Sequence, residues 1–222
     1  MRTFLLPLLI GITSVIYIFI IPADPLAFKI ICKLIPMMLI ILYAFRRLPV
    51  KPSTAHRLLV MGLFFCIMGD GLIAVSFVAG LGAFLIGHLF YLSGFLKAAR
   101  ASKRHVLAIV PIAIYAFVIG RQLIASLLIQ GNDQLVLPVI FYMLAISLMA
   151  LSAVLTGNFQ AIAGSTLFII SDSILSWNMF VSAIPFSDLF IMGTYYAAQF
   201  LIAGSLSSLG SHAGHASAGL EA

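Results

Sequence analysis

Charged residues are scarce in this sequence. Asp, Glu, Lys and Arg make up 8% of its 222 residues, whereas an ordinary soluble domain is about one quarter charged. Apolar residues make up 63% of the chain. Because so few polar side chains could cover a globule in water, the composition excludes a soluble fold. It predicts an all-α, polytopic membrane protein.

Cysteine is also rare, and the common catalytic motifs are missing. Cys32 and Cys66 both lie inside apolar runs, where they give neither a disulfide framework nor the ligand spacing of a metal centre. The sequence has no nucleophile elbow, no HExxH motif and no glycine-rich phosphate loop. We therefore expect no metal and no cofactor, and mechanisms that depend on these motifs have no support.

Eight apolar runs are long enough to cross a bilayer. The predicted helices cover residues 4–21, 27–45, 58–79, 81–99, 106–129, 134–155, 160–181 and 187–208. No small-residue cleavage site precedes Pro22, so we expect the first run to be a retained helix and not a signal peptide. Residues 1–208 are thus predicted to form one eight-helix transmembrane domain. Residues 209–222, rich in Ser, Gly, Ala and His, are predicted to be a disordered tail.

The basic residues are unevenly distributed. They gather near the N-terminus and in the loops 46–57 and 97–104, whereas the loops on the opposite face carry Asp24, Asp133 and Asp188. With eight helices, the positive-inside rule predicts a cell-membrane protein whose two termini and two basic loops are cytoplasmic. The net charge of +6 is then a topology signal, and no nucleic-acid partner is expected.

Two aspartates lie inside predicted membrane helices. A carboxylate at the centre of such a helix costs roughly 2.5–3.5 kcal/mol on insertion scales, and an aspartate side chain is too short to reach the interface. Small residues flank Asp70 in GDGLIA and Asp172 in SDSILS, which lets neighbouring helices approach closely. At 1.5 Å per residue, each aspartate lies roughly 18 Å from the cytoplasmic end of its helix. We therefore predict a functional site at these two residues.

Further polar side chains are predicted at nearly the same depth. They are Lys33, His88, Arg121, Tyr142 and Tyr195. Some of them have a structural alternative: His88 could be a hydrogen-bonded core residue, and Arg121 could extend to the interface, as Lys29 is expected to do. Together with the aspartates they predict one polar layer between the midplane and the outer leaflet.

Four segments resemble the YhhN-like membrane proteins, the lysoplasmalogenases. These segments are KLIP at 33–36, GDGLI with GLGAFLIGHLFYLSGF within 69–95, FIISDSILSWNMF at 168–180 and GTYYAAQFLI at 193–202. They cover nearly the whole chain in the right order. The resemblance implies hydrolysis of the vinyl ether bond of lysoplasmalogens to a fatty aldehyde and glycerophosphoethanolamine or glycerophosphocholine. The expected partners are a lyso-ether-phospholipid and the bilayer, and the oligomeric state is left open.

Cleavage of a vinyl ether fits the two aspartates. Protonation of the β-carbon gives an oxocarbenium ion, which water then traps as a hemiacetal. Glycosidases use one carboxylic acid and one carboxylate around such a cation. Asp70 and Asp172 are therefore the predicted catalytic residues, and which of them is the acid stays open.

A headgroup phosphate would need side-chain partners, because the chain has no glycine-rich loop. The predicted substrate-binding residues are Lys33, His88, Tyr91, Asn178, Tyr195 and Gln199. Tyr195 and Gln199 are four residues apart and share a helix face, as do His88 and Tyr91, which are three apart.

Two other classes of protein also use buried charges. An intramembrane aspartyl protease has two aspartates on neighbouring helices, but its GxGD motif is not met because Ile67 stands at the first glycine. A proton-coupled transporter would use Asp, Lys and His as a relay. The broken helices expected of a transporter are not evident, since Pro111 and Pro138 lie near helix ends. Both classes remain alternatives to lipid hydrolysis.

Overall fold

The computed structural model describes residues 2–22, 24–99 and 107–209, and eight α-helices but no strand occur among them. The helices are α1 (Arg2–Phe19), α2 (Leu26–Arg47), α3 (Thr54–Leu72), α4 (Phe77–Ala98), α5 (Ile109–Ile129), α6 (Val136–Thr156), α7 (Phe159–Phe180) and α8 (Ser187–Ser205). A short 3₁₀ helix, η2 (Asp133–Leu135), precedes α6. The predicted all-α class is confirmed.

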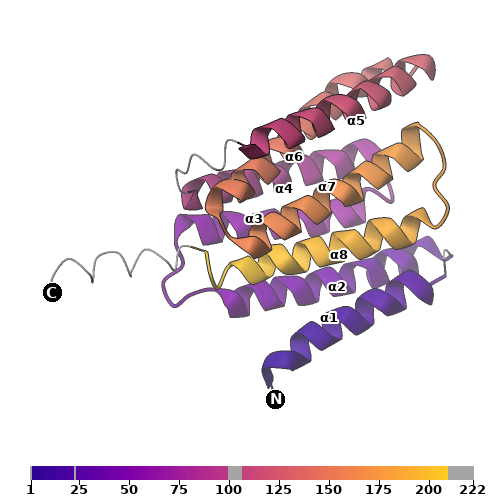
Figure 1. Cartoon of the computed structure of the whole chain (residues 1–222). Helices are drawn as coiled ribbons and strands as arrows, with labels where there is room; N and C mark the ends of the chain where they lie inside the picture. Colours follow the sequence, from indigo (N-terminus) through magenta and orange to yellow (C-terminus); the bar gives the residue numbers. More distant parts are fainter. Residues whose placement is uncertain (1, 23, 100–106, 210–222) are drawn as a thin grey trace.

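The helices pack side by side as one bundle (Figure 1). α3 packs along α4 and α7 along α8, while α8 also contacts α2 and α6 also contacts α4. α1 and α5 lie at opposite edges of the bundle, and α1 begins on the side where α8 ends (Figure 1). The predicted functional residues lie on the helices in the middle of this bundle, namely α2, α3, α4, α7 and α8.

Length and composition make six of these helices candidate membrane spans. They are α2 to α7, with η2 extending α6, whereas Phe4–Phe19 in α1 forms a shorter apolar helix. Large apolar side chains such as Ile114 and Phe117 on α5 are exposed on the outside of the bundle, where lipid would cover them. The chain is therefore a multi-pass membrane protein, and the eight spans stay a prediction.

The interior is closely packed up to the end of the described chain. Met37, Leu59, Phe168 and Ile202 are fully buried, and Leu209, which was assigned to the tail, is also buried. Residues 210–222 and 100–106 lie outside the described residues. Three predictions fall on those residues and are not tested by the structure. They concern the tail beyond Leu209, the start of helix five at Val106 and the basic side chains of 100–104.

The predicted boundary between the third and fourth helices is wrong. The prediction continued the third helix to Ala79, but α3 ends at Leu72 and α4 begins at Phe77. Ser76 caps α4, because its side chain accepts a hydrogen bond of 3.4 Å from the Ala79 N–H. Because this stretch is apolar apart from Ser76, hydropathy alone did not indicate the turn.

A glycine makes this early turn possible. A Cβ on Gly80 would lie 2.5 Å from the Cα of Ile73, so only a residue without a side chain allows the first turn of α4 to pass so close. The earlier end of α3 also moves Asp70. Instead of lying in mid-helix, Asp70 is two residues from the C-terminal end of α3.

Candidate active site

Asp70 lies where α3 faces α2 and α8, and both of its carboxylate oxygens have partners. The Lys33 Nζ lies 3.1 Å from Oδ1, and the Tyr195 hydroxyl donates a hydrogen bond of 2.6 Å to Oδ2. The Asp70 residue is 1% exposed. Burial of a charge requires this kind of compensation, because an unpaired carboxylate loses its hydration without gaining an opposite charge. The contacts fit an ionised Asp70.

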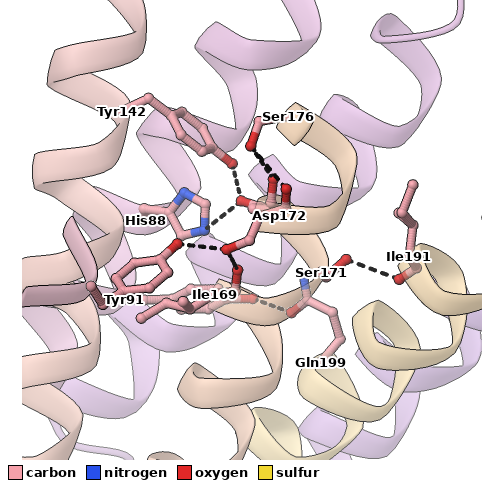
Figure 2. A network of polar contacts seen from close by, with 11 residues as sticks. His88, Tyr91, Tyr142, Ile169, Ser171, Asp172, Ser176, Ile191 and Gln199 are labelled. Atoms are coloured by element: carbon pink, nitrogen blue, oxygen red, sulfur yellow. Dashed lines mark hydrogen bonds and ion pairs between the residues drawn. The ribbon is translucent and has the colours of Figure 1, made fainter. Parts of the chain in front are cut away.

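Asp172 lies in the middle of α7 and has different neighbours (Figure 2). The Tyr142 hydroxyl donates a hydrogen bond of 2.5 Å to Oδ2, and the His88 Nε2 lies 4.0 Å from the same oxygen. Among the described residues, no lysine or arginine forms an ion pair with Asp172. Within the part of the chain that the structure describes, the two aspartates thus differ in that Asp70 pairs with a lysine, whereas the basic group nearest to Asp172 is His88.

The small residues beside each aspartate fix its orientation. The Ser171 hydroxyl donates a 2.9 Å hydrogen bond to the Ile191 carbonyl of α8 (Figure 2), and the Ser173 hydroxyl lies 2.6 Å from that of Tyr115 on α5. These bonds hold α7 between two helices and fix its rotation. Next to Asp70, Gly69 instead lets α3 and α4 approach closely. A Cβ on Gly69 would lie only 2.8 Å from the Phe84 ring of α4.

Both aspartates line the same cavity. Its volume is about 370 Å³, and Lys33 and Tyr195 also lie in its wall. Lys29 and Asp188 line the cavity too, with 3.8 Å between the Lys29 Nζ and the Asp188 Oδ2. Most of the remaining wall is apolar. The cavity is therefore large enough for several water molecules and for part of a lipid, and both aspartates border it.

An apolar cleft adjoins this cavity at Asp172. Its volume is about 50 Å³, and residues of α4, α5, α6 and α7 form most of its wall. Asp172, Phe77, Phe84 and Leu175 belong to both walls, whereas Leu123 and Val139 line only the cleft. Asp172 thus lies between a cavity whose wall carries charged groups and a cleft whose wall is mostly apolar.

Four of the predicted binding residues do not line the 370 Å³ cavity. His88, Tyr91 and Gln199 are completely buried behind it, and the Tyr91 hydroxyl donates a 2.6 Å hydrogen bond to the Gln199 Oε1. The Asn178 Oδ1 accepts a 2.8 Å hydrogen bond from the Ile184 N–H, so it stabilises the loop after α7. Lys33 and Tyr195 are the two predicted binding residues that the structure brings to the cavity.

One further prediction about the polar layer needs correction, and one lysine has a position that was not predicted. Arg121 does not join it, because its side chain is exposed on α5 at the edge of the bundle. Lys29 was treated as an interface residue, but it lines the cavity together with Asp188. The spacing of Lys29 and Lys33 was a usable signal, since residues four apart share a helix face. The sequence has no comparable signal for Asp188, because an aspartate at the start of a helix is common and does not by itself indicate a site.

The fold and the site together define a class: helical membrane proteins with two carboxylates in the wall of one cavity. Within the described residues, no group of three or more His, Cys, Asp or Glu is placed to hold a metal ion.

The sequence model of the YhhN family matches residues 28–206. The chain belongs to the YhhN family, and the resemblance carried by its four motifs is confirmed.

The chain is also similar to proteins named lysoplasmalogenases. The chain is 30% identical to the lysoplasmalogenase TMEM86B of Mus musculus over 206 residues, which cover 90% of this chain and 85% of the relative. It is 32% identical to a lysoplasmalogenase of Mycobacterium tuberculosis over 162 residues, which cover 66% of this chain and 59% of that relative. No solved structure matches the chain.

Proposed function

We propose that this protein is a lysoplasmalogenase that uses Asp70 and Asp172 to hydrolyse the vinyl ether bond of a lyso-ether-phospholipid. The observation that carries the proposal is that both carboxylates line one cavity of about 370 Å³ inside a helical membrane protein. Membership of the YhhN family and the names of the relatives support the same substrate.

The surroundings of the two aspartates support different roles. Asp70 is ion-paired with Lys33 at 3.1 Å, so we assign it the anionic role of general base. Asp172 has a hydroxyl and a histidine beside it and lies next to the apolar cleft, so we assign it the role of proton donor. Two carboxylates with opposite protonation states are the arrangement that acid–base chemistry at an oxocarbenium ion requires.

The reaction then proceeds in three steps. Asp172 gives its proton to the β-carbon of the vinyl ether, where the π electron pair forms the new C–H bond and leaves an oxocarbenium ion. Asp70 takes a proton from a water molecule while the water oxygen bonds to the cationic carbon, which gives a hemiacetal. Next, the hemiacetal C–O bond to glycerol breaks. The leaving oxygen takes the proton from Asp70, and the hemiacetal hydroxyl returns a proton to Asp172.

The remaining residues would act at different distances from the substrate. Lys33 and Tyr195 line the cavity and would contact the lipid as well as hold Asp70. His88, Tyr91 and Gln199 lie behind the cavity wall, where they would support Asp172 and the packing of α4 against α8. Asn178 would keep its place in the loop after α7. No cofactor is needed for this chemistry.

For the membrane we propose the arrangement that the charges predict, with eight spans and both termini in the cytoplasm. The described basic residues near helix ends, such as Arg46, Arg47 and Lys97, support this orientation. Asp188 and Lys29, at the opposite ends of their helices, would then place the cavity on the outer-leaflet side.

Hydrolysis in D₂O by the detergent-purified protein tests the proposed reaction. A 1-alkenyl lysophospholipid should release an aldehyde that carries one deuterium on the carbon next to the carbonyl, provided borohydride traps it at once as the alcohol. A saturated 1-alkyl lysophospholipid is the matched control and should stay intact. Cleavage of a membrane peptide instead, or no aldehyde above the protein-free rate, would contradict the proposal.

A further inference from the structure

Two ion pairs follow one another along the wall of the cavity. Lys33 pairs with Asp70, and the two side chains are 16% and 2% exposed; Lys29 pairs with Asp188, and these side chains are 33% and 85% exposed. All four residues line the cavity. Because Lys29 and Lys33 are four residues apart on α2, they lie on one face, about 6 Å apart along the helix axis. The charges thus run from a buried pair to an exposed pair.

The outer pair contributes little as a structural bond. Its atoms are 3.8 Å apart, and exposed pairs are worth about 0–1 kcal/mol because water and salt screen them. Lys29 and Asp188 can therefore separate, and each can pair with an oppositely charged group of a ligand, at little cost in free energy. The inner pair differs, since Asp70 is buried and held by both Lys33 and Tyr195.

We propose that this outer end of the cavity is a binding site for a zwitterionic phosphodiester headgroup. The phosphate lies between Lys29 and Lys33, and the ammonium group pairs with Asp188. The inference deepens the proposed function, because its ligand is the headgroup of the lyso-ether-phospholipid. It adds a reason for headgroup selection that the catalytic aspartates do not supply.

The charge pattern favours a zwitterion over an anion. A headgroup with both charges replaces both partners of the outer pair, so Lys29 and Asp188 each keep an opposite charge. An anionic headgroup without an ammonium group satisfies Lys29 but brings its negative charge next to an unpaired Asp188. Such repulsion against the wrong ligand is a general source of specificity.

The opposite end of the cavity supports the same orientation of the lipid. There the apolar cleft begins at Asp172 and continues between Leu123 and Val139, and its volume of about 50 Å³ would protect the first carbons of a hydrocarbon chain from water. A lysolipid with its headgroup at Lys29 and these first carbons in the cleft would hold the bond at the start of its chain near Asp172. In a lysoplasmalogen, that bond is the vinyl ether.

Binding of lipids that cannot be cleaved tests the headgroup site separately from catalysis. The ligands are two saturated 1-alkyl lysophospholipids, one with a phosphoethanolamine and one with a phosphoglycerol headgroup, titrated by calorimetry into the purified full chain at low salt. Wild-type protein should bind the phosphoethanolamine lipid about three- to fivefold more tightly, as an exposed charge pair allows. Asp188→Asn should remove this preference by weakening only the phosphoethanolamine lipid, whereas Lys29→Gln should weaken both.

Asp133→Asn is the matched control, because Asp133 is an exposed aspartate that does not line the cavity. It should leave the preference unchanged. Equal binding of the two lipids by wild-type protein, or an Asp188→Asn variant that keeps the preference, would overturn the headgroup site. Because neither lipid contains a vinyl ether, a protein that shows the preference but releases no aldehyde would refute the proposed function and not this inference.

Discussion

At the scale of single residues, the two aspartates differ in what they touch, and the proposed roles follow from that difference. Asp70 accepts a hydrogen bond from Tyr195 and pairs with Lys33, whereas Asp172 accepts a hydrogen bond from Tyr142. A carboxylate between a cation and a hydroxyl can remain an anion in an apolar interior. The partners can be varied one at a time, which gives two predictions.

Tyr195→Phe should lower kcat about 10- to 100-fold. The substitution removes the hydroxyl that orients Asp70 but keeps the ring, and a hydrogen bond to a charged group is worth about 1.5–3 kcal/mol. Steady-state kinetics of aldehyde release measure the effect. Tyr43→Phe is the control, since Tyr43 is a buried tyrosine stacked on Phe200. Equal losses in both variants would show that tyrosine hydroxyls matter here only for general stability.

Lys33→Met should both inactivate and destabilise the protein, because it leaves the Asp70 charge buried without its partner. Breaking a buried ion pair in this way costs about 3–5 kcal/mol. The double variant Lys33→Met/Asp70→Asn removes both charges, so its thermal stability should recover while its activity stays lost. A double variant as unstable as the single one would mean that Lys33 acts through packing and not through its charge.

At the scale of helices, the contact between α3 and α4 determines where the site residues lie. Glycines recur every seven residues on both helices, at Gly62 and Gly69 on α3 and at Gly80, Gly87 and Gly94 on α4. A Cβ on Gly94 would lie 2.9 Å from Leu59, and one on Gly62 only 2.4 Å from the Tyr91 ring. These positions let the two backbones approach closely, as small residues do in membrane helices.

Gly87→Ala should lower the temperature of thermal unfolding in detergent. Its Cβ would lie 2.9 Å from the Cys66 sulfur and 3.3 Å from the Gly62 carbonyl oxygen, and such overpacking costs about 1–3 kcal/mol. Gly82→Ala on the same helix is the control, because nothing lies within 4 Å of its Cβ. The control should unfold at the wild-type temperature or slightly above it. Matching losses in the two variants would contradict close packing at Gly87.

The helices could be predicted well from the sequence, but the turn between α3 and α4 could not. Long apolar runs broken by Pro and Gly are strong signals, so most helix ends agree closely with prediction. The stretch from Gly71 to Gly82 is apolar except for Ser76, and this capping serine was the one local sign of a boundary. The turn at that point also depends on the contact of Gly80 with Ile73, which no local pattern indicates.

At the scale of the whole molecule, the sequence identified the candidate aspartates but not most of their surroundings. Buried carboxylates are costly wherever they occur, so Asp70 and Asp172 stood out without any structure. The pairing of Tyr195 with Asp70 joins residues 125 positions apart, and that of Tyr142 with Asp172 depends on how α6 meets α7. Depth alone could not separate Tyr195, which lines the cavity, from Gln199, which lies behind it.

The orientation of the bundle gives a further prediction. Cysteine at Val50, a fully exposed residue between α2 and α3, should be protected from a membrane-impermeant thiol reagent in intact cells and react after permeabilisation. Cysteine at Asn132, in the turn before η2, should react without permeabilisation. The unsubstituted chain is the background control, since Cys66 is buried and Cys32 is partly buried. The reverse labelling pattern would invert the bundle and open the cavity toward the cytoplasm.

The central claim, that Asp70 and Asp172 together catalyse vinyl ether hydrolysis, is tested most directly by the turnover of their isosteric amides. Asp70→Asn and Asp172→Asn keep the size of each side chain and can still accept the Tyr195 and Tyr142 hydrogen bonds. In folded, purified protein each should lower kcat for aldehyde release by about 10²–10⁴-fold, the usual contribution of a general acid or base. Asp133→Asn, which changes an exposed carboxylate outside the cavity, should retain wild-type turnover. Near wild-type turnover by either folded active-site variant would contradict the two-carboxylate mechanism.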